Sequence, residues 1–140
     1  MIGIRRARPE ERQALEDLQR RASLALEEYR EQLLAHPDAV DLPAEHLAEG
    51  TTLVAEVDGA VAGFAVLLGS ELDGLFVDPA HWKAGIGSAL VEAVAHEARK
   101  EGLSVSVVAS PTARSFYEKC GFSVEGETET RFGPALRMSR

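Results

Sequence analysis

The residues best suited to chemistry lie in the segment FVDPAHWKAGIGSALVEAVAHEARK, residues 76–100. Two glycines one residue apart, Gly85 and Gly87, stand where an apolar stripe with helical spacing begins, and Ser88 follows them. The first amides of a helix have no partners within it, and the helix dipole adds about half a positive charge there. Because glycine lets a ligand approach the backbone closely, this turn is suited to bind phosphate oxygens. The structural alternative is a tight strand-to-helix turn without a ligand.

Two common phosphate-binding motifs do not fit this turn. A nucleotide P-loop would place Lys and then Ser or Thr after its last glycine, whereas Gly87 is followed by Ser88 and Ala89. A dinucleotide-binding motif needs a third glycine three residues after Gly87, where Leu90 stands, and an early βαβ unit. The sequence therefore disfavours a nucleotide-dependent enzyme.

A second segment, LSVSVVASPTARSFYEKCGF at residues 103–122, contains a β-prone run, a Ser-Pro break and a short helical stretch ending at Gly121. Together the two segments resemble the GNAT superfamily of N-acetyltransferases. The family's cofactor loop, Gln/Arg-x-x-Gly-x-Gly/Ala, falls on Trp82, Gly85 and Gly87. Its later pattern, Asn-x-x-Ala-x-x-Phe-Tyr-x-x-x-Gly-Phe, falls on Ser110, Ala113, Phe116, Tyr117, Gly121 and Phe122.

The resemblance implies an enzyme that moves an acetyl group from acetyl-CoA directly to a primary amine of a small molecule or protein. It implies that the backbone of residues 75–77 pairs with the pantetheine arm, and that the Val77 amide polarises the thioester carbonyl. The implied cofactor-binding residues are Leu75, Phe76, Val77, Trp82, Lys83, Ala84, Gly85, Ile86, Gly87, Ser88, Ser110, Ala113 and Phe116. Trp82 and Ser110 replace the family's Gln/Arg and Asn, which motivates an alternative function: a non-catalytic acyl-CoA-binding regulatory module on the same fold.

Acetyl transfer needs a neutral amine and a proton for the departing thiolate. A lysine-like amine with a pKa of ~10.4 is about one part in 10³ neutral at pH 7, so a base assists the reaction. Our candidate base is Glu71, at the start of the strand that leads into the glycine turn, a position where GNAT enzymes with a carboxylate base place their Glu. Asp73, expected on the same strand face, is the second candidate, and a water chain is the third. The structural alternative for both carboxylates is an exposed residue at a strand start.

The candidate acid, from the resemblance, is Tyr117. In the family this tyrosine lies near the thioester sulfur and protonates the departing thiolate. A phenol with an ordinary pKa of ~10 can do so, an effect typically worth ~10²–10⁴-fold. The structural alternative is an aromatic ring that packs the short helix onto the sheet, a role we assign to Phe116.

The length of the chain suits one domain spanning residues 1–140, which is enough to bury about two thirds of the unfolded surface. No run approaches the ~20 apolar residues of a membrane span, and the first residues lack the apolar stretch of a signal peptide. One cysteine, Cys120, can form no internal disulfide, so we expect a cytoplasmic protein. We therefore expect no membrane partner.

Charge and histidine spacing exclude two further classes of ligand. The net charge of −8 disfavours nucleic acid, which needs a basic face. The four histidines lack the spacing of a metal site, so no metal is expected. An acidic surface mildly favours a cationic amine as the partner of acetyl-CoA. Homodimers are common in the family, so the resemblance adds a homodimer as an expectation.

The elements that must position these residues are strands interspersed with helices. This order predicts an α/β fold with helices packed on a mixed, mainly antiparallel sheet. A hairpin is predicted at Asp58-Gly59. The resemblance adds that the fourth and fifth strands splay apart to admit the pantetheine arm. The predicted elements are strand Ile2–Arg6, a helical region Pro9–Ala35 with a break near Ser23, strands Thr51–Val57, Ala60–Leu68 and Glu71–Val77, helix 86–100, strand 103–109, helix 112–119, and strands near 122–126 and 132–138.

Overall fold

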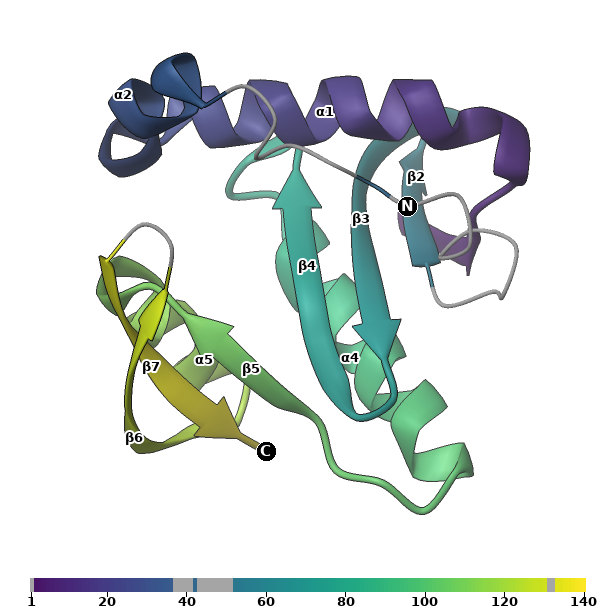
Figure 1. Ribbon diagram of the computed structural model, residues 1–140. Helices are drawn as coiled ribbons and strands as arrows, with labels where there is room; N and C mark the ends of the chain where they lie inside the picture. The colour runs from purple at the N-terminus through teal and green to yellow at the C-terminus, as the bar shows by residue number, and fades with distance from the viewer. Residues whose placement is uncertain (1, 37–41, 43–51, 131–132) are drawn as a thin grey trace.

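The computed structural model describes residues 2–36, 42, 52–130 and 133–140, and within them the chain forms a seven-stranded sheet (Figure 1). The strands lie in the order β1-β2-β3-β4-β5-β7-β6, and all pairs are antiparallel except β4 and β5. The prediction of a mixed, mainly antiparallel sheet flanked by helices is confirmed. The strands are β1 (Ile2–Arg6), β2 (Thr52–Val57), β3 (Ala60–Leu68), β4 (Glu71–Val77), β5 (Ser106–Ala109), β6 (Ser123–Thr130) and β7 (Gly133–Ser139).

Helices pack on both faces of this sheet. The helix α1 (Arg12–Ala25) runs across one face and continues into α2 (Glu27–Ala35), whereas α4 (Ile86–Lys100) and α5 (Arg114–Lys119) lie on the other face (Figure 1). The strand pattern explains both contacts, because successive residues point to opposite faces. In β2, Val54 packs with Leu15 and Leu18 of α1, while its neighbours Leu53 and Ala55 pack with the α4 side.

The first half of the chain follows the predicted elements closely. Asp58 and Gly59 both adopt a left-handed backbone, with φ of 52° and 82°, as the tight turn of a β2–β3 hairpin requires. β2 begins at Thr52, and Thr51, which was predicted to begin this strand, lies outside the described part of the chain. The helical region breaks at Leu26, three residues beyond the predicted Ser23, because Leu26 has an extended backbone.

The second half shows two differences in strand boundaries. The strand predicted over 103–109 is confined to β5, because Gly102, with φ of 71°, ends α4, and the Gly102 and Leu103 amides bond back to carbonyls of Arg99 and Ala98. The strands predicted near 122–126 and 132–138 form a longer hairpin of β6 and β7, and the residues between them lie outside the described ranges.

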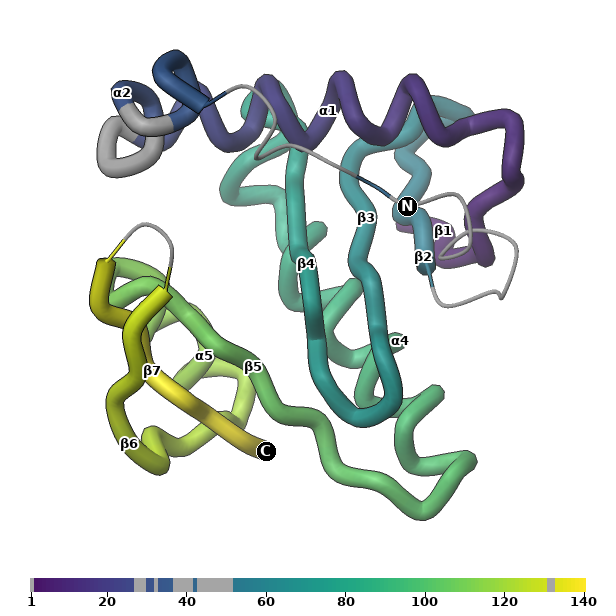
Figure 2. Tube along the Cα trace, viewed as in Figure 1, coloured from purple at the N-terminus to yellow at the C-terminus, as the bar shows by residue number. Residues whose placement is uncertain are grey.

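The fourth and fifth strands separate as the resemblance implied. They pair only where Glu71 lies opposite Ser106 and Leu72 opposite Val107. Beyond this point the two strands diverge toward the top of the view (Figures 1 and 2). Along residues 73–77, β4 therefore has no neighbouring strand on one side within the described chain. We call this side the unpaired β4 edge.

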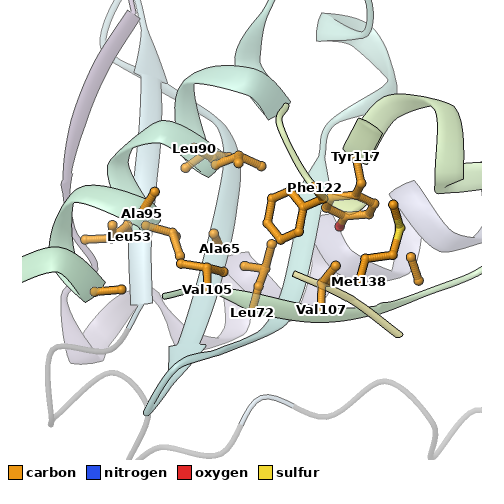
Figure 3. Close-up of a cluster of buried hydrophobic side chains, with 14 of the residues drawn as sticks. Leu53, Ala65, Leu72, Leu90, Ala95, Val105, Val107, Tyr117, Phe122 and Met138 are labelled. Atoms are coloured by element: carbon orange, nitrogen blue, oxygen red, sulfur yellow. The ribbon is translucent and has the colours of Figure 1, made fainter. Parts of the chain in front are cut away.

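Two clusters of buried side chains hold the layers together. The larger lies between the sheet and helices α4 and α5, and includes Leu72, Leu90, Val107, Tyr117 and Met138 (Figure 3). The smaller lies under α1, around Phe64. Because α4 packs on β2, β3 and β4 while Tyr117 and Phe122 pack toward β5 and β7, the larger cluster joins the two diverging parts of the sheet.

Candidate active site

β4 leads into the glycine turn through a short loop that has two side-chain anchors. Asp78, at its start, accepts hydrogen bonds from the Ala80 amide at 3.1 Å and from Arg21 of α1 at 3.0 Å. Burial opposes ionisation of this carboxyl, but the Ala80 amide and the Arg21 guanidinium prevail and hold the pKa of Asp78 below its ordinary value. The indole Nε1–H of Trp82 donates to the Val77 carbonyl at 2.8 Å. The loop is therefore held both to α1 and to the end of β4.

The glycine turn presents backbone amides that have no partner among the residues that the structure describes. Lys83 and Gly85 both have a left-handed backbone, with φ of 66° and 81°, and α4 begins at the next residue. The Ala89 amide bonds to the Gly85 carbonyl at 3.0 Å, so the three amides of residues 86–88 precede the first helical hydrogen bond. No side chain caps this end of α4 in the described part of the chain. Ala84, Gly85 and Ser88 are exposed, whereas Ile86 is buried and fixes the turn on the sheet.

Three segments that the sequence connected with the cofactor meet at Gly87. A β-carbon at Gly87 would lie 3.1 Å from the Phe116 ring of α5 and 3.8 Å from Val77 of β4. The glycine turn, the end of β4 and α5 are thus in contact. The same distances give Gly87 a packing function of its own, because any side chain there would press on Phe116.

The residues that match the family's later pattern, from Ser110 onward, lie beside this contact. Ser110 precedes the short turn η4 (Pro111–Ala113), and its hydroxyl lies 3.1 Å from that of Thr112. Ala113 and Phe116 are half-buried and pack against the larger cluster. Ser110 is also half-buried and follows directly after β5, at the end where β5 has separated from β4.

Tyr117 is more deeply buried than Phe116, with 7% of its surface exposed. Its ring makes edge contacts with Phe116 and Phe122, at centroid distances of 5.0 and 5.4 Å. Leu72, Val107 and Met138 are paired neighbours on three adjacent strands, and the Tyr117 ring lies beside Val107 and Met138 (Figure 3). The sequence argument assigned packing to Phe116 alone; in the structure Tyr117 contributes at least as much of it.

The two candidate bases lie at the end of β4 that pairs with β5, which we call the closed end of the strand pair. Glu71 is exposed and lies opposite Ser106, and Leu72, the next residue, points into the larger cluster, so Glu71 lies on the opposite face. Asp73 is also exposed. The β3–β4 register slips at this point, since Val66 pairs with Gly74 and Leu67 with Leu72. Asp73 is the extra residue of a bulge, so simple alternation from Glu71 does not fix its direction.

The unpaired β4 edge carries backbone groups of two of the three predicted residues. The Asp78 amide donates to the Ala62 carbonyl of β3 at 2.8 Å. Because bonded pairs alternate along an antiparallel ladder, Phe76 also turns its N–H and C=O toward β3. Leu75 and Val77 turn theirs toward the unpaired edge. The side chain of Phe76 packs on the α1 side, 5.3 Å from the Phe64 ring.

Two contacts in this site were absent from the sequence analysis. Trp82 was treated as the loss of a cofactor-binding donor, and the structure shows that its indole N–H binds Val77. The Arg21–Asp78 ion pair joins positions 57 residues apart, for which the sequence gave no direct signal. The Asp-Pro pair at positions 78 and 79 is a local signal that could have predicted the capped turn at Asp78. No helix in the described residues is long and apolar enough to cross a bilayer.

A sheet with splayed fourth and fifth strands, an unpaired strand edge and an uncapped glycine turn beside it define an acyl-CoA-dependent transferase fold. The model of the acetyltransferase (GNAT) family matches residues 13–122, and the chain belongs to this family. It is an N-acetyltransferase, and acetyl-CoA is the co-substrate of the family.

Similar proteins agree with this assignment. The chain is 36% identical over 131 residues to the peptidyl-lysine N-acetyltransferase YjaB of Salmonella typhimurium, covering 92% of this chain and 88% of the relative. A GCN5-related N-acetyltransferase structure from Rhodopseudomonas palustris superposes with a TM-score of 0.84 at 25% identity, covering 99% and 94% of the two chains. The PaiA N-acetyltransferase of Thermoplasma acidophilum, solved with coenzyme A, shares the fold with a TM-score of 0.77 at 22% identity, covering 100% of this chain and 98% of that one.

Proposed function

We propose that this chain transfers the acetyl group of acetyl-CoA to the side-chain amine of a protein or peptide lysine. The observation that carries the proposal is the unpaired β4 edge, which ends beside the uncapped amides at the start of α4. A pantetheine arm has amides that can pair with such an edge, and a pyrophosphate can accept from amides at a helix start. The Salmonella relative, named for its action on peptidyl-lysine, supports lysine as the acceptor.

We assign each part of acetyl-CoA to a part of this site. The pyrophosphate lies against the amides of residues 86–88, and the adjoining loop residues Lys83 and Ala84 line its approach. The arm runs along Leu75 and Val77, whose backbone groups face it, between β4 and the segment that carries Ser110, Ala113 and Phe116. The thioester then lies toward the end of β4 that pairs with β5, where Leu72 meets Val107. This placement is distant from Val77, so it does not keep the role of the Val77 amide in polarising the thioester carbonyl.

The groups that donate and accept protons in the proposed reaction lie on opposite faces of the sheet. The lysine nitrogen attacks the thioester carbon, the C–S bond breaks, and the bonding electron pair leaves on sulfur. Tyr117, on the α5 side, gives its proton to that sulfur. Glu71, on the opposite face, accepts the proton that the amine loses, directly or through water. The acceptor therefore approaches from the α1 face. The exposed carboxylate of Glu71 favours the approach of a cation from that face.

The remaining assignments extend this proposal to the whole protein. Residues 1–140 act as one domain, since the family match covers most of the chain and β7 completes the sheet. We place the protein in the cytoplasm, where acetyl-CoA and lysine-bearing proteins occur together and where a free thiol such as that of Cys120 is kept reduced. A homodimer stays a prediction of the resemblance.

The test is a thiol-release assay with acetyl-CoA and a panel of acceptors: lysine peptides, N-terminal amines and small polyamines. We expect release with lysine peptides, and a 42 Da mass increase on the lysine side chain confirms the product. Tight acetyl-CoA binding without release for any amine would instead favour the non-catalytic module.

Gly87→Glu is the matched inactive variant. Its carboxylate would meet the phosphates and press on Phe116, so calorimetry should find acetyl-CoA binding abolished. Micromolar affinity in this variant would place the phosphates elsewhere.

A further inference from the structure

Trp82 is the only tryptophan of the chain, and it stands where the family pattern has Gln or Arg. Its side chain is 42% exposed, so the core does not require it. It nevertheless makes one defined polar contact, the 2.8 Å hydrogen bond from its indole Nε1–H to the Val77 carbonyl. This contact links the residue three positions before Gly85 to the last residue of β4.

The direction of the Val77 carbonyl shows which edge of β4 the Trp82 indole binds. The bond between the Asp78 amide and Ala62 fixes the alternation of the β3–β4 ladder, so that Val77 turns its N–H and C=O away from β3. Its carbonyl therefore belongs to the unpaired β4 edge. The Trp82 indole takes the place that a neighbouring strand would occupy at the end of this edge nearest the glycine turn.

We propose that Trp82 is a positioning residue for acetyl-CoA, which caps the Val77 carbonyl and holds the glycine turn at a fixed place relative to the unpaired β4 edge. The proposal rests on the function proposed above. With one lone pair of the Val77 carbonyl bound by the indole, the pantetheine arm pairs with the Val77 N–H and with both groups of Leu75. Trp82 thus replaces the polar side chain of the family pattern by acting on the protein's own backbone.

A second anchor makes the effect of Trp82 separable from general loop disorder. The Arg21–Asp78 ion pair and the Ala80 amide hold the first half of the loop, and they do not involve the indole. Removing the indole N–H should therefore release only the second half, residues 82–85. The fold should persist, because the cluster around Ile86 and Leu90 is unchanged.

The experiment compares Trp82→Phe, which keeps an aromatic ring but lacks the donor, with the wild type. The KM for acetyl-CoA should rise about fivefold, the usual effect of losing one neutral hydrogen bond, while kcat with a lysine peptide changes less than twofold. Leu103→Ala is the matched control, since Leu103 is also 42% exposed but follows the other end of α4. It should leave both constants unchanged.

A spectroscopic measurement gives an independent readout. As the sole tryptophan, Trp82 reports directly on its surroundings, and saturating CoA should shift its fluorescence emission to shorter wavelength by shielding it from water. An unchanged KM in Trp82→Phe, or an unshifted emission in the presence of calorimetrically bound CoA, would overturn the role of Trp82 and leave the proposed function intact. Absence of calorimetric binding by the wild type would overturn both.

Discussion

At the residue scale, Tyr117 is a packing residue to which we also assign a chemical role. Its ring fills the space between Phe116 and Phe122 and belongs to the larger core cluster. Its hydroxyl is the group to which we assign protonation of the departing thiolate. Because the ring is held from two sides, the hydroxyl has a fixed position, which is what a general acid requires.

Replacing Tyr117 by Phe separates the two roles, since it keeps the ring contacts and removes only the hydroxyl. We expect kcat to fall at least tenfold while acetyl-CoA binding, measured by calorimetry, stays within twofold. The melting temperature should fall by no more than the few degrees that ~1 kcal/mol represents. An unaltered turnover rate would remove Tyr117 from the mechanism and leave it as a packing residue.

At the scale of elements, the two glycines that open α4 serve different structural needs. Gly85 has a left-handed backbone with φ of 81°, and a β-carbon there would meet no atom of the described residues within 4 Å. Gly87 has no such backbone constraint, but its missing side chain lets the Phe116 ring of α5 pack directly on the helix. The turn therefore favours glycine for its backbone conformation, and the close packing favours glycine for its missing side chain, whether or not phosphate is bound.

These needs predict opposite responses to substitution. At Gly85, Asn should be tolerated and Ala should cost about 1 kcal/mol, because Asn enters the left-handed region more readily than Ala does. At Gly87, Ala and Asn should both destabilise, with Asn worse, since the obstacle is the space occupied by Phe116. Urea unfolding of the four variants checks the pattern. Equal effects of Ala and Asn at both positions would contradict it.

The elements also show what the sequence could and could not predict. The bounds of β4 and α4 and the Asp58-Gly59 turn follow from local signals: β-prone runs, a helical apolar stripe and a left-handed pair. The bulge at Asp73 depends on the register with β3. Strand alternation alone, which predicted Asp73 on the same face as Glu71, could not detect it. The Trp82–Val77 bond depends on which way the Val77 carbonyl turns, and this also follows from β3 pairing rather than from the loop sequence.

At the scale of the whole molecule, the splayed sheet must be stabilised without full pairing of β4 and β5. The larger cluster joins the two parts from the α4 and α5 side, and α1 covers β2, β3 and β4 from the other side. The N-terminal edge is closed by Arg5 of β1, which forms a bidentate ion pair with Glu11 at 2.8 and 2.9 Å and also binds Glu56 of β2. This network holds the start of α1 against the sheet.

The Arg5–Glu11 pair makes the stability of the fold sensitive to acid. The hydrogen bonds from Arg5 lower the pKa of Glu11 from its ordinary 4.5 to about 2. A carboxyl whose pKa is lower in the folded state stabilises the fold above its unfolded pKa, and this contribution is lost as pH falls from about 4.5 toward 2. Glu11→Gln should therefore lower the free energy of unfolding by about 1–2 kcal/mol at pH 7, after allowance for solvent screening, and by progressively less below pH 4.5.

Urea unfolding of Glu11→Gln and wild type at pH 7, 4.5 and 3 measures this difference. The control is Glu118→Gln, because Glu118 pairs with Arg114 on α5 where both side chains are about half exposed. That pair should contribute less than about 0.5 kcal/mol at any pH. If the deficit of Glu11→Gln were the same at pH 3 as at pH 7, the loss would come from packing, and the charge of Glu11 would have no part in holding α1 to the sheet.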